Sequence, residues 1–248
     1  MRFINNVLTA AALIGALTAA PASAVGTGIL FQVQEGVVPG SAANLITADS
    51  FDFSYNAIIN QSASPAFTET GNLQFSSYKT GIVTQPAQLN TLAALGGYGI
   101  LGSFSASGNA TPNGSGGLTA NFSTFNLTLG LDADQNGTTD NILGTATQVG
   151  PGQAHIFNGL ANGDFDVVLL FTPTAFGNTY FVKPTPFIVT LEVTGNTTTI
   201  SGASMTGPFT ASVDGSGNGF LVVPEPGTVA LMGVALLAAG FSSRRGAK

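Results

Sequence analysis

Hydrophobic and polar residues alternate along much of the middle of the chain. Three segments carry this pattern most clearly: FDFSYNAII at 51–59, FNLTLGL at 125–131 and FIVTLEV at 187–193. Successive side chains of a β-strand point to opposite faces, so strict alternation places one face on a core and the other in water. The pattern therefore predicts antiparallel β-sheets that are buried on one side.

Further short strands are expected between turns that are rich in Gly, Pro and Asn. The candidates are 29–34, 71–79, 99–107, 165–172 and 198–205. A short helix is expected only at 88–95. Strands separated by such turns are typical of sandwiches and jelly rolls. We predict an all-β fold: one antiparallel β-sandwich or jelly-roll-like domain over residues 25–213, followed by a flexible, Gly-rich hinge at 214–223.

The start of the chain has the order of a secretory signal. Arg2 precedes an apolar stretch at 7–20, and the small residues Ala22 and Ala24 lie three and one positions before Val25. A basic start, an apolar middle and a small-residue exit predict a signal peptide over residues 1–24, with a signal helix, cleaved before Val25. The chain contains no Cys, so the exported fold has no disulfides and depends on its core.

The other end of the chain repeats an apolar run in a different context. Pro224, Glu225 and Pro226 precede the apolar run 227–241, which Arg244 and Arg245 follow. Both prolines lack a backbone donor and fix φ, so this tripeptide stays extended. The run predicts a C-terminal transmembrane helix with the arginines on the cytoplasmic side, which places the bulk of the protein outside. The inner membrane is therefore expected as a transient partner.

The net charge of the exported part limits the classes of molecule that it can bind. Residues 25–223 contain two lysines and eleven acidic residues, hence a net charge of −9. Phosphate binding requires clustered Lys and Arg. Nucleic acid is therefore not an expected partner.

The segment 132–143, DADQNGTTDNIL, is the strongest chemical signal in the chain. Oxygen-bearing groups stand at positions 1, 3, 5, 7 and 9 of an EF-hand-like loop: Asp132, Asp134, Asn136, the Thr138 carbonyl and Asp140. The segment departs from an EF-hand at position 12, where Leu143 replaces the bidentate Glu, and the residues before it are strand-like. Two interpretations stay open: a β-loop calcium site, or a polar hairpin turn with Asn-Gly at its tip. Calcium is the one cofactor that the sequence suggests.

The sequence offers few of the residue combinations that common catalytic sites require. The chain has no Cys nucleophile, and His155 is its single His, which excludes a His-rich zinc site. Asp164 and Asp166 lie at strand spacing and could imitate a glycosidase pair, or could simply solvate the start of a strand. We therefore expect a protein that is not an enzyme.

Two family resemblances add to these expectations. Residues 223–245 resemble the PEP-CTERM sorting signal of Gram-negative bacteria, which implies processing by an exosortase in cells that make exopolysaccharide. The segments LITADSFDFSYNAII, GGYG, ANGDF and YFVKPTPF, in this order within 27–205, resemble the flocculation-associated PEP-CTERM protein family. That resemblance implies an extracellular matrix or surface protein that promotes flocculation or biofilm formation with exopolysaccharide, and it implies no catalytic residue.

The expected function is thus an exported, exosortase-processed protein, first anchored in the inner membrane and finally extracellular or on the cell surface. Exposed tyrosines at 55, 78, 98 and 180 could stack on sugars, and half-buried strand positions are the alternative for each. A calcium-dependent carbohydrate-binding module is the alternative function. A polysaccharide-modifying enzyme is a third.

Overall fold

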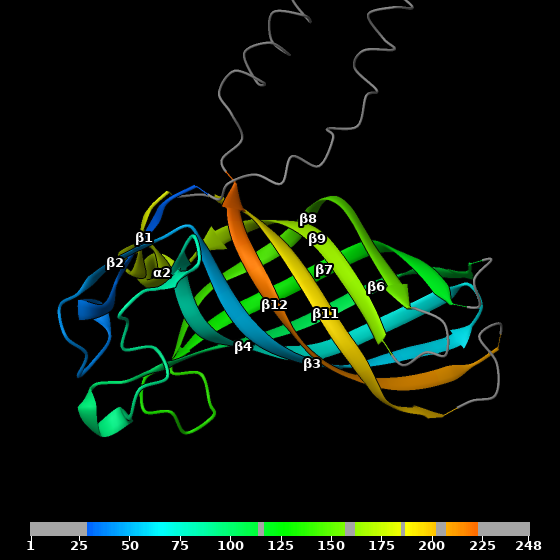
Figure 1. Ribbon diagram of the computed structural model, residues 1–248, viewed down its shortest axis with the longest axis horizontal. Coiled ribbons are helices and arrows are strands. Elements are labelled where there is room, and N and C mark those ends of the chain that lie inside the picture. The colour runs from blue at the N-terminus through cyan, green and yellow to red at the C-terminus, as the bar shows by residue number, and fades with distance from the viewer. Residues whose placement is uncertain (1–28, 114–116, 157–161, 185–186, 202–206, 223–248) are drawn as a thin grey trace, which may run out of the picture.

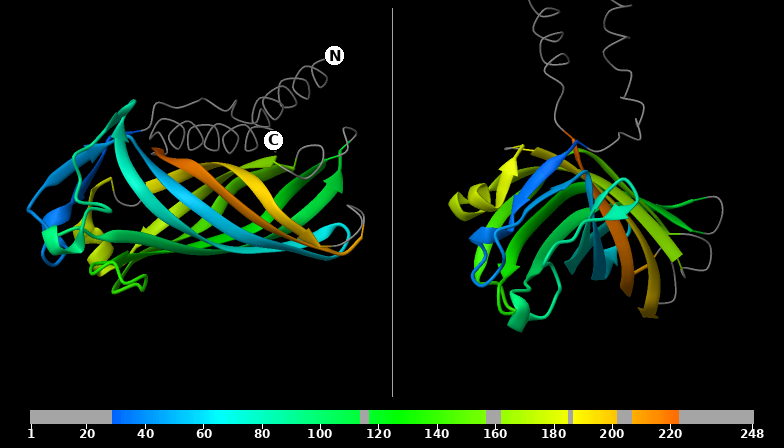
Figure 2. Two further views of the ribbon diagram at one scale, coloured as in Figure 1. Left: turned by 60° about the horizontal axis from the view of Figure 1, so that its bottom comes forward. Right: turned by 60° about the vertical axis from the view of Figure 1, so that its left-hand side comes forward.

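Eight long antiparallel strands make up most of the protein. The computed structural model describes residues 29–113, 117–156, 162–184, 187–201 and 207–222 (Figure 1). The long strands are β3 (Ser50–Ala63), β4 (Ala66–Thr80), β6 (Gly99–Pro112), β7 (Leu118–Asp132), β8 (Asn141–Ile156), β9 (Asn162–Pro173), β11 (Phe187–Ser201) and β12 (Phe209–Val222). Each pairs with the next along the chain, and β12 pairs with β3. The sheet therefore closes on itself into an up-and-down barrel, which Figure 2 shows from two further directions.

The prediction of a sandwich or jelly roll is wrong, although the antiparallel, all-β character is confirmed. A sandwich has two sheets with free edges, whereas here β12 joins β3 in a continuous register from Phe209 opposite Gln61 to Phe220 opposite Ser50. The Gly-rich stretch 214–222, expected as a hinge, lies inside β12. Its glycines permit the closure, because a Cβ at Gly219 would collide with the ring of Phe51 on the neighbouring strand. The same stretch that looked flexible is thus a wall of the barrel.

The core lies inside the barrel rather than between two sheets. On each long strand the apolar residues of the alternating pattern point inward and are buried. Aromatic rings fill much of the lumen: Phe104 stacks on Phe125 with ring centroids 5.0 Å apart, and on Tyr55 at 5.6 Å. Burial of such rings supplies most of the free energy that holds a barrel of this size together.

A smaller assembly covers one end of the barrel, at the left in Figure 1. It contains a three-stranded sheet of β1 (Phe31–Gln34), β2 (Leu45–Ala48) and β10 (Phe181–Lys183), together with helix α2 (Ala175–Tyr180). The short elements η1 (Glu35–Val37), β5 (Val83–Thr84) and η2 (Ala93–Leu95) complete the fold. We call β1, β2, β10, α2, η1 and η2 together the plug. Of the helix predicted at 88–95, only the 3-10 turn η2 forms.

Three tyrosines meet beneath the plug in a buried hydrogen-bonded network. The Tyr180 hydroxyl lies 2.7 Å from that of Tyr78 and 2.8 Å from that of Tyr98. Tyr98 donates to Oε1 of Glu35 at 2.9 Å, and this carboxyl is fully buried. Of the two interpretations of Tyr55 and these three tyrosines, exposure for stacking on sugars is wrong. All four are buried, more deeply than the half-buried strand positions of the alternative, and their hydroxyls have partners inside the protein.

Both ends of the chain fall outside the described part. The signal helix predicted at 1–24 and the transmembrane helix predicted at 227–241 lie there. Within the described ranges, no helix has the length and apolar character needed to cross a membrane.

Candidate functional site

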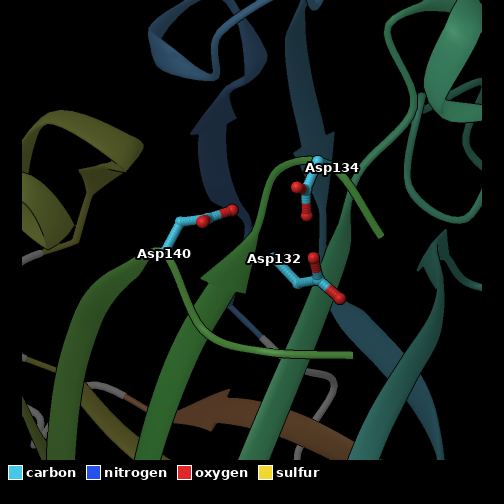
Figure 3. A group of neighbouring side chains, drawn as sticks. All are labelled: Asp132, Asp134 and Asp140. Atoms are coloured by element: carbon cyan, nitrogen blue, oxygen red, sulfur yellow. The ribbon is translucent and has the colours of Figure 1, made fainter. Parts of the chain in front are cut away.

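The loop between β7 and β8 brings three acidic side chains together. Asp132, Asp134 and Asp140 each place a carboxylate oxygen within 4.8 Å of the others. Figure 3 shows the three side chains on this loop. Asp132 is buried at the end of β7, whereas the other two are exposed. Three of the five predicted calcium ligands are thus neighbours in space.

Backbone amides hold these carboxylates in place. Asp132 accepts hydrogen bonds from the N–H groups of Asn136 at 3.1 Å and Gly137 at 2.9 Å. Gly137 has φ of +84°, a left-handed conformation that favours glycine and lets the loop turn back. Asp140 accepts from the Ala133 N–H at 2.7 Å. Each carboxylate keeps free lone pairs, so the cluster offers hard oxygen ligands of the kind that Ca²⁺ prefers.

The two remaining predicted ligands form a local turn. The Asn136 side-chain oxygen accepts from the Thr138 N–H at 2.8 Å and from the Thr138 hydroxyl. This is the geometry of an Asx turn, which forms with or without an ion. Both interpretations of the segment, a calcium site and a polar turn, fit the loop.

The candidate catalytic residues lie on the barrel wall. His155 on β8 and Asp164 on β9 are register neighbours, and His155 Nδ1 lies 3.0 Å from Asp164 Oδ1. The pKa of Asp166 is raised, mainly because burial penalises its charged form; His155 lowers it and the charge of Asp164 raises it. Both side chains of the His155–Asp164 pair are about two-fifths exposed. This arrangement is that of a partly exposed, hydrogen-bonded pair on two neighbouring strands rather than of two carboxyls facing each other across a groove.

Sequence reasoning missed a polar pair inside the barrel. Tyr55 on β3 donates a hydrogen bond to Oε1 of Glu69 on β4, and both side chains line a cavity in the lumen. The pKa of Glu69 is raised to about 7, because burial penalises its charge more than the Tyr55 hydrogen bond favours it. The signal was present in the alternation of Phe67, Glu69 and Leu73, which places Glu69 on the inward face.

The outer face of the barrel is polar and largely uncharged. Five hydroxyl or amide side chains are successive cross-strand neighbours on β3, β4, β6, β7 and β8: Asn56, Asn72, Ser103, Thr128 and Thr145. Four of them are exposed and Thr128 is half-buried. We call them the polar row. Directly opposed residues of an antiparallel pair have Cβ atoms about 5 Å apart, so the row forms a continuous band of donors and acceptors.

Comparison with known proteins identifies the end of the chain. Residues 222–245 match the PEP-CTERM protein-sorting motif, which confirms the sorting signal predicted around Pro224 to Pro226 and Arg244 to Arg245. No curated protein and no solved structure matches the chain. The motif indicates export, transient anchoring in a membrane, and processing by an exosortase before the protein reaches the cell surface or the medium.

Proposed function

Because the chain carries a PEP-CTERM sorting motif, we propose that it is a non-enzymatic matrix or surface component that promotes flocculation or biofilm formation by binding exopolysaccharide. Its host would be a Gram-negative bacterium that exports exopolysaccharide. The observation that carries this proposal is the polar row, a band of neutral hydrogen-bonding groups on the outer wall of an exported barrel.

The polar row suits a polysaccharide better than a protein or a membrane. Neutral hydroxyl and amide groups donate and accept hydrogen bonds as sugar hydroxyls do. Their regular spacing across the sheet allows contacts with several successive sugars. Each hydrogen bond contributes only about 1 kcal/mol net. Avidity on a polymer would come from many such contacts and from many copies of the protein.

Replacing the polar row should weaken binding to exopolysaccharide. We expect the triple variant Asn72→Ala, Ser103→Ala and Thr145→Ala to lose roughly a hundredfold in apparent affinity, because three hydrogen-bonding groups of about 1 kcal/mol each are removed. The measurement is co-sedimentation of the purified protein with the exopolysaccharide of its own host.

A second triple variant on strands β11 and β12, with Thr194, Thr210 and Ser216 changed to Ala, is the matched control. These residues also lie exposed on the outer face. Equal loss in both variants would contradict a role for the polar row in particular. Failure of the wild-type protein to sediment with the polymer would contradict the proposed function itself.

A calcium-dependent carbohydrate-binding module is the second candidate, supported by the clustering of Asp132, Asp134 and Asp140. If the loop binds Ca²⁺, saturation at a hundred times the dissociation constant should stabilise the fold by about 2.7 kcal/mol and raise Tm by about 5 °C or more. The measurement is thermal unfolding with Ca²⁺ and with a chelator.

Asp140→Asn should abolish that shift in Tm, because it weakens one of the three ligands. Asp214→Asn, which removes the same charge from the exposed face of β12, should leave the shift intact. An identical Tm with Ca²⁺ and with chelator would assign the loop to a simple polar turn.

A further inference from the structure

A cavity occupies the half of the barrel lumen that lies farthest from the plug. Its lining comes from the distal halves of the long strands and includes Ile59, Phe67, Ala120, Phe165 and Phe209. The plug is attached at the opposite end, where β2 leads into β3 and β9 leads into α2. Closed antiparallel barrels of eight strands are just wide enough to be filled by side chains or to hold one small ligand. Small residues such as Ala120 leave this end of the lumen incompletely filled.

Two carboxyls line this apolar cavity: Asp164, whose side chain is about two-fifths exposed, and Glu69, which is deeply buried. Glu69 is 3% exposed and lines the cavity, and its Oε1 accepts the hydrogen bond from Tyr55. An apolar wall with a buried polar group is the usual composition of a small-molecule site, in which the polar group orients the ligand. Burial of an unpaired carboxylate is costly, so a cationic partner would be strongly favoured there.

The charges around the cavity select the sign of such a ligand. Lys79 and Lys183 are the two lysines of the described residues, and neither reaches Glu69: Lys79 pairs with Asp52, and Lys183 is exposed on β10. His155 and Asp164 both contribute to the lining, and the His155 ring pairs with the Asp164 carboxyl rather than with Glu69. An anionic ligand would bury a second negative charge beside Glu69 without compensation. An ammonium group would supply the missing counter-charge.

We propose that the distal lumen binds a short, apolar primary amine, with the alkyl chain among the lining side chains and the ammonium group paired with Glu69. The space open to the centre of a water molecule is about 60 Å³. At roughly 10 to 15 Å³ per water, this space corresponds to about four to six waters, and thus to a ligand of similarly few heavy atoms. The inference is independent of polysaccharide binding, which concerns the outer face.

The test compares three probes that share one four-carbon chain: n-butylamine, n-butanol and butyrate. Binding is measured at pH 8 by saturation-transfer NMR titration of the processed protein isolated from its host. An alkylammonium ion stays charged at this pH, as Lys does with a pKa of about 10.4. We expect butylamine to bind at least tenfold more tightly than butanol, and butyrate to bind more weakly than both.

The affinity for butylamine should also depend on pH, because Glu69 pairs with the ammonium group only when it is ionised. Tyr55 on β3 is the titratable neighbour that perturbs Glu69, and it stays neutral because burial raises its pKa. His155 on β8 and Asp164 on β9 also line the cavity, where they pair with each other, and the lining residues Phe67 and Phe165 carry no titratable group. The pKa of Glu69 is about 7. The ionised fraction rises about tenfold between pH 6 and pH 8, and the affinity for butylamine should rise by the same factor.

Two matched variants separate a binding site from a structural pair. Glu69→Gln should reduce the affinity for butylamine to that for butanol and abolish its pH dependence, whereas Glu192→Gln, the same change on the exposed face of β11, should alter neither. Ala120→Leu, which fills the cavity, should reduce the binding of all three probes. Equal binding of the three probes, unchanged amine binding in Glu69→Gln, or no detectable butylamine binding would overturn the proposal.

Discussion

Replacing Glu69 by glutamine is expected to remove most of the dependence of stability on pH between pH 5 and pH 8. In the unfolded chain the Glu69 carboxyl loses its proton near the ordinary pKa of 4.5, whereas in the folded protein it does so at about 7. The folded state therefore binds more protons in this window, and the free energy of unfolding falls as the pH rises. The stabilisation is fully present below pH 4.5, and its loss through pH 7 amounts to about 3 kcal/mol.

The measurement is urea unfolding of the wild type and of Glu69→Gln at pH 5 and pH 8. Glutamine keeps an acceptor for the Tyr55 hydroxyl but cannot ionise, so this variant should be more stable than the wild type at pH 8 and similar to it at pH 5. Glu192→Gln, on the exposed face of β11, should preserve the wild-type dependence. Parallel pH profiles for the wild type and Glu69→Gln would show that the lumen carboxyl has an ordinary pKa.

Removal of the Glu35 side chain should destabilise the protein through the network under the plug. Oε1 of Glu35 accepts hydrogen bonds from the Tyr98 hydroxyl at 2.9 Å and the Gln88 N–H at 2.7 Å, and Oε2 accepts from Asn44 Nδ2 at 3.1 Å. Glu35→Ala leaves these donors without their acceptor in the interior. Hydrogen bonds to a carboxylate contribute about 1.5 to 3 kcal/mol each, so a loss of about 3 kcal/mol or more is expected.

Guanidinium unfolding of Glu35→Ala, Glu35→Gln and the wild type provides the measurement. Glu35→Gln keeps one acceptor oxygen and should lose less than the alanine variant. Tyr180→Phe removes a hydroxyl that bridges Tyr78 and Tyr98, and should cost about 1 kcal/mol. A change of less than about 0.5 kcal/mol in Glu35→Ala would mean that water replaces the carboxyl, and that the plug does not depend on this contact.

Local patterns predicted the strands well and the closure badly. Segments such as 51–59 and 187–193 alternate strictly, so their strands and buried faces follow from side-chain geometry alone. Closure depends on the pairing of β3 with β12, whose residues are about 160 positions apart in the sequence. No local pattern encodes such a pairing. The glycines of β12 were misleading, because a residue chosen to admit the Phe51 ring is also typical of a flexible hinge.

The candidate sites divide in the same way. The acidic loop was predictable, because its three acidic residues lie within nine positions of one short connection between two paired strands. The Tyr55–Glu69 pair was not, since its meaning depends on the closed lumen that buries it. The tyrosine network also joins residues from distant segments: Tyr78, Tyr98 and Tyr180. The sequence left exposed and half-buried positions open for these tyrosines, because the partners of their hydroxyls lie far away in the chain.

The pairing of β3 with β12 is expected to form last when the chain folds during export. Export through a membrane delivers the chain from its N-terminal side, so the strands from β3 to β11 can pair one after another as they emerge. The unpaired edge of β3 then waits for β12, which ends at Val222, the residue at which the sorting motif begins. The barrel can therefore close only when the segment directly before the motif has crossed. Folding should therefore be completed at nearly the same time as the motif reaches the exosortase. A chain that stalls during export would instead expose the unpaired edge of β3, which is prone to aggregation.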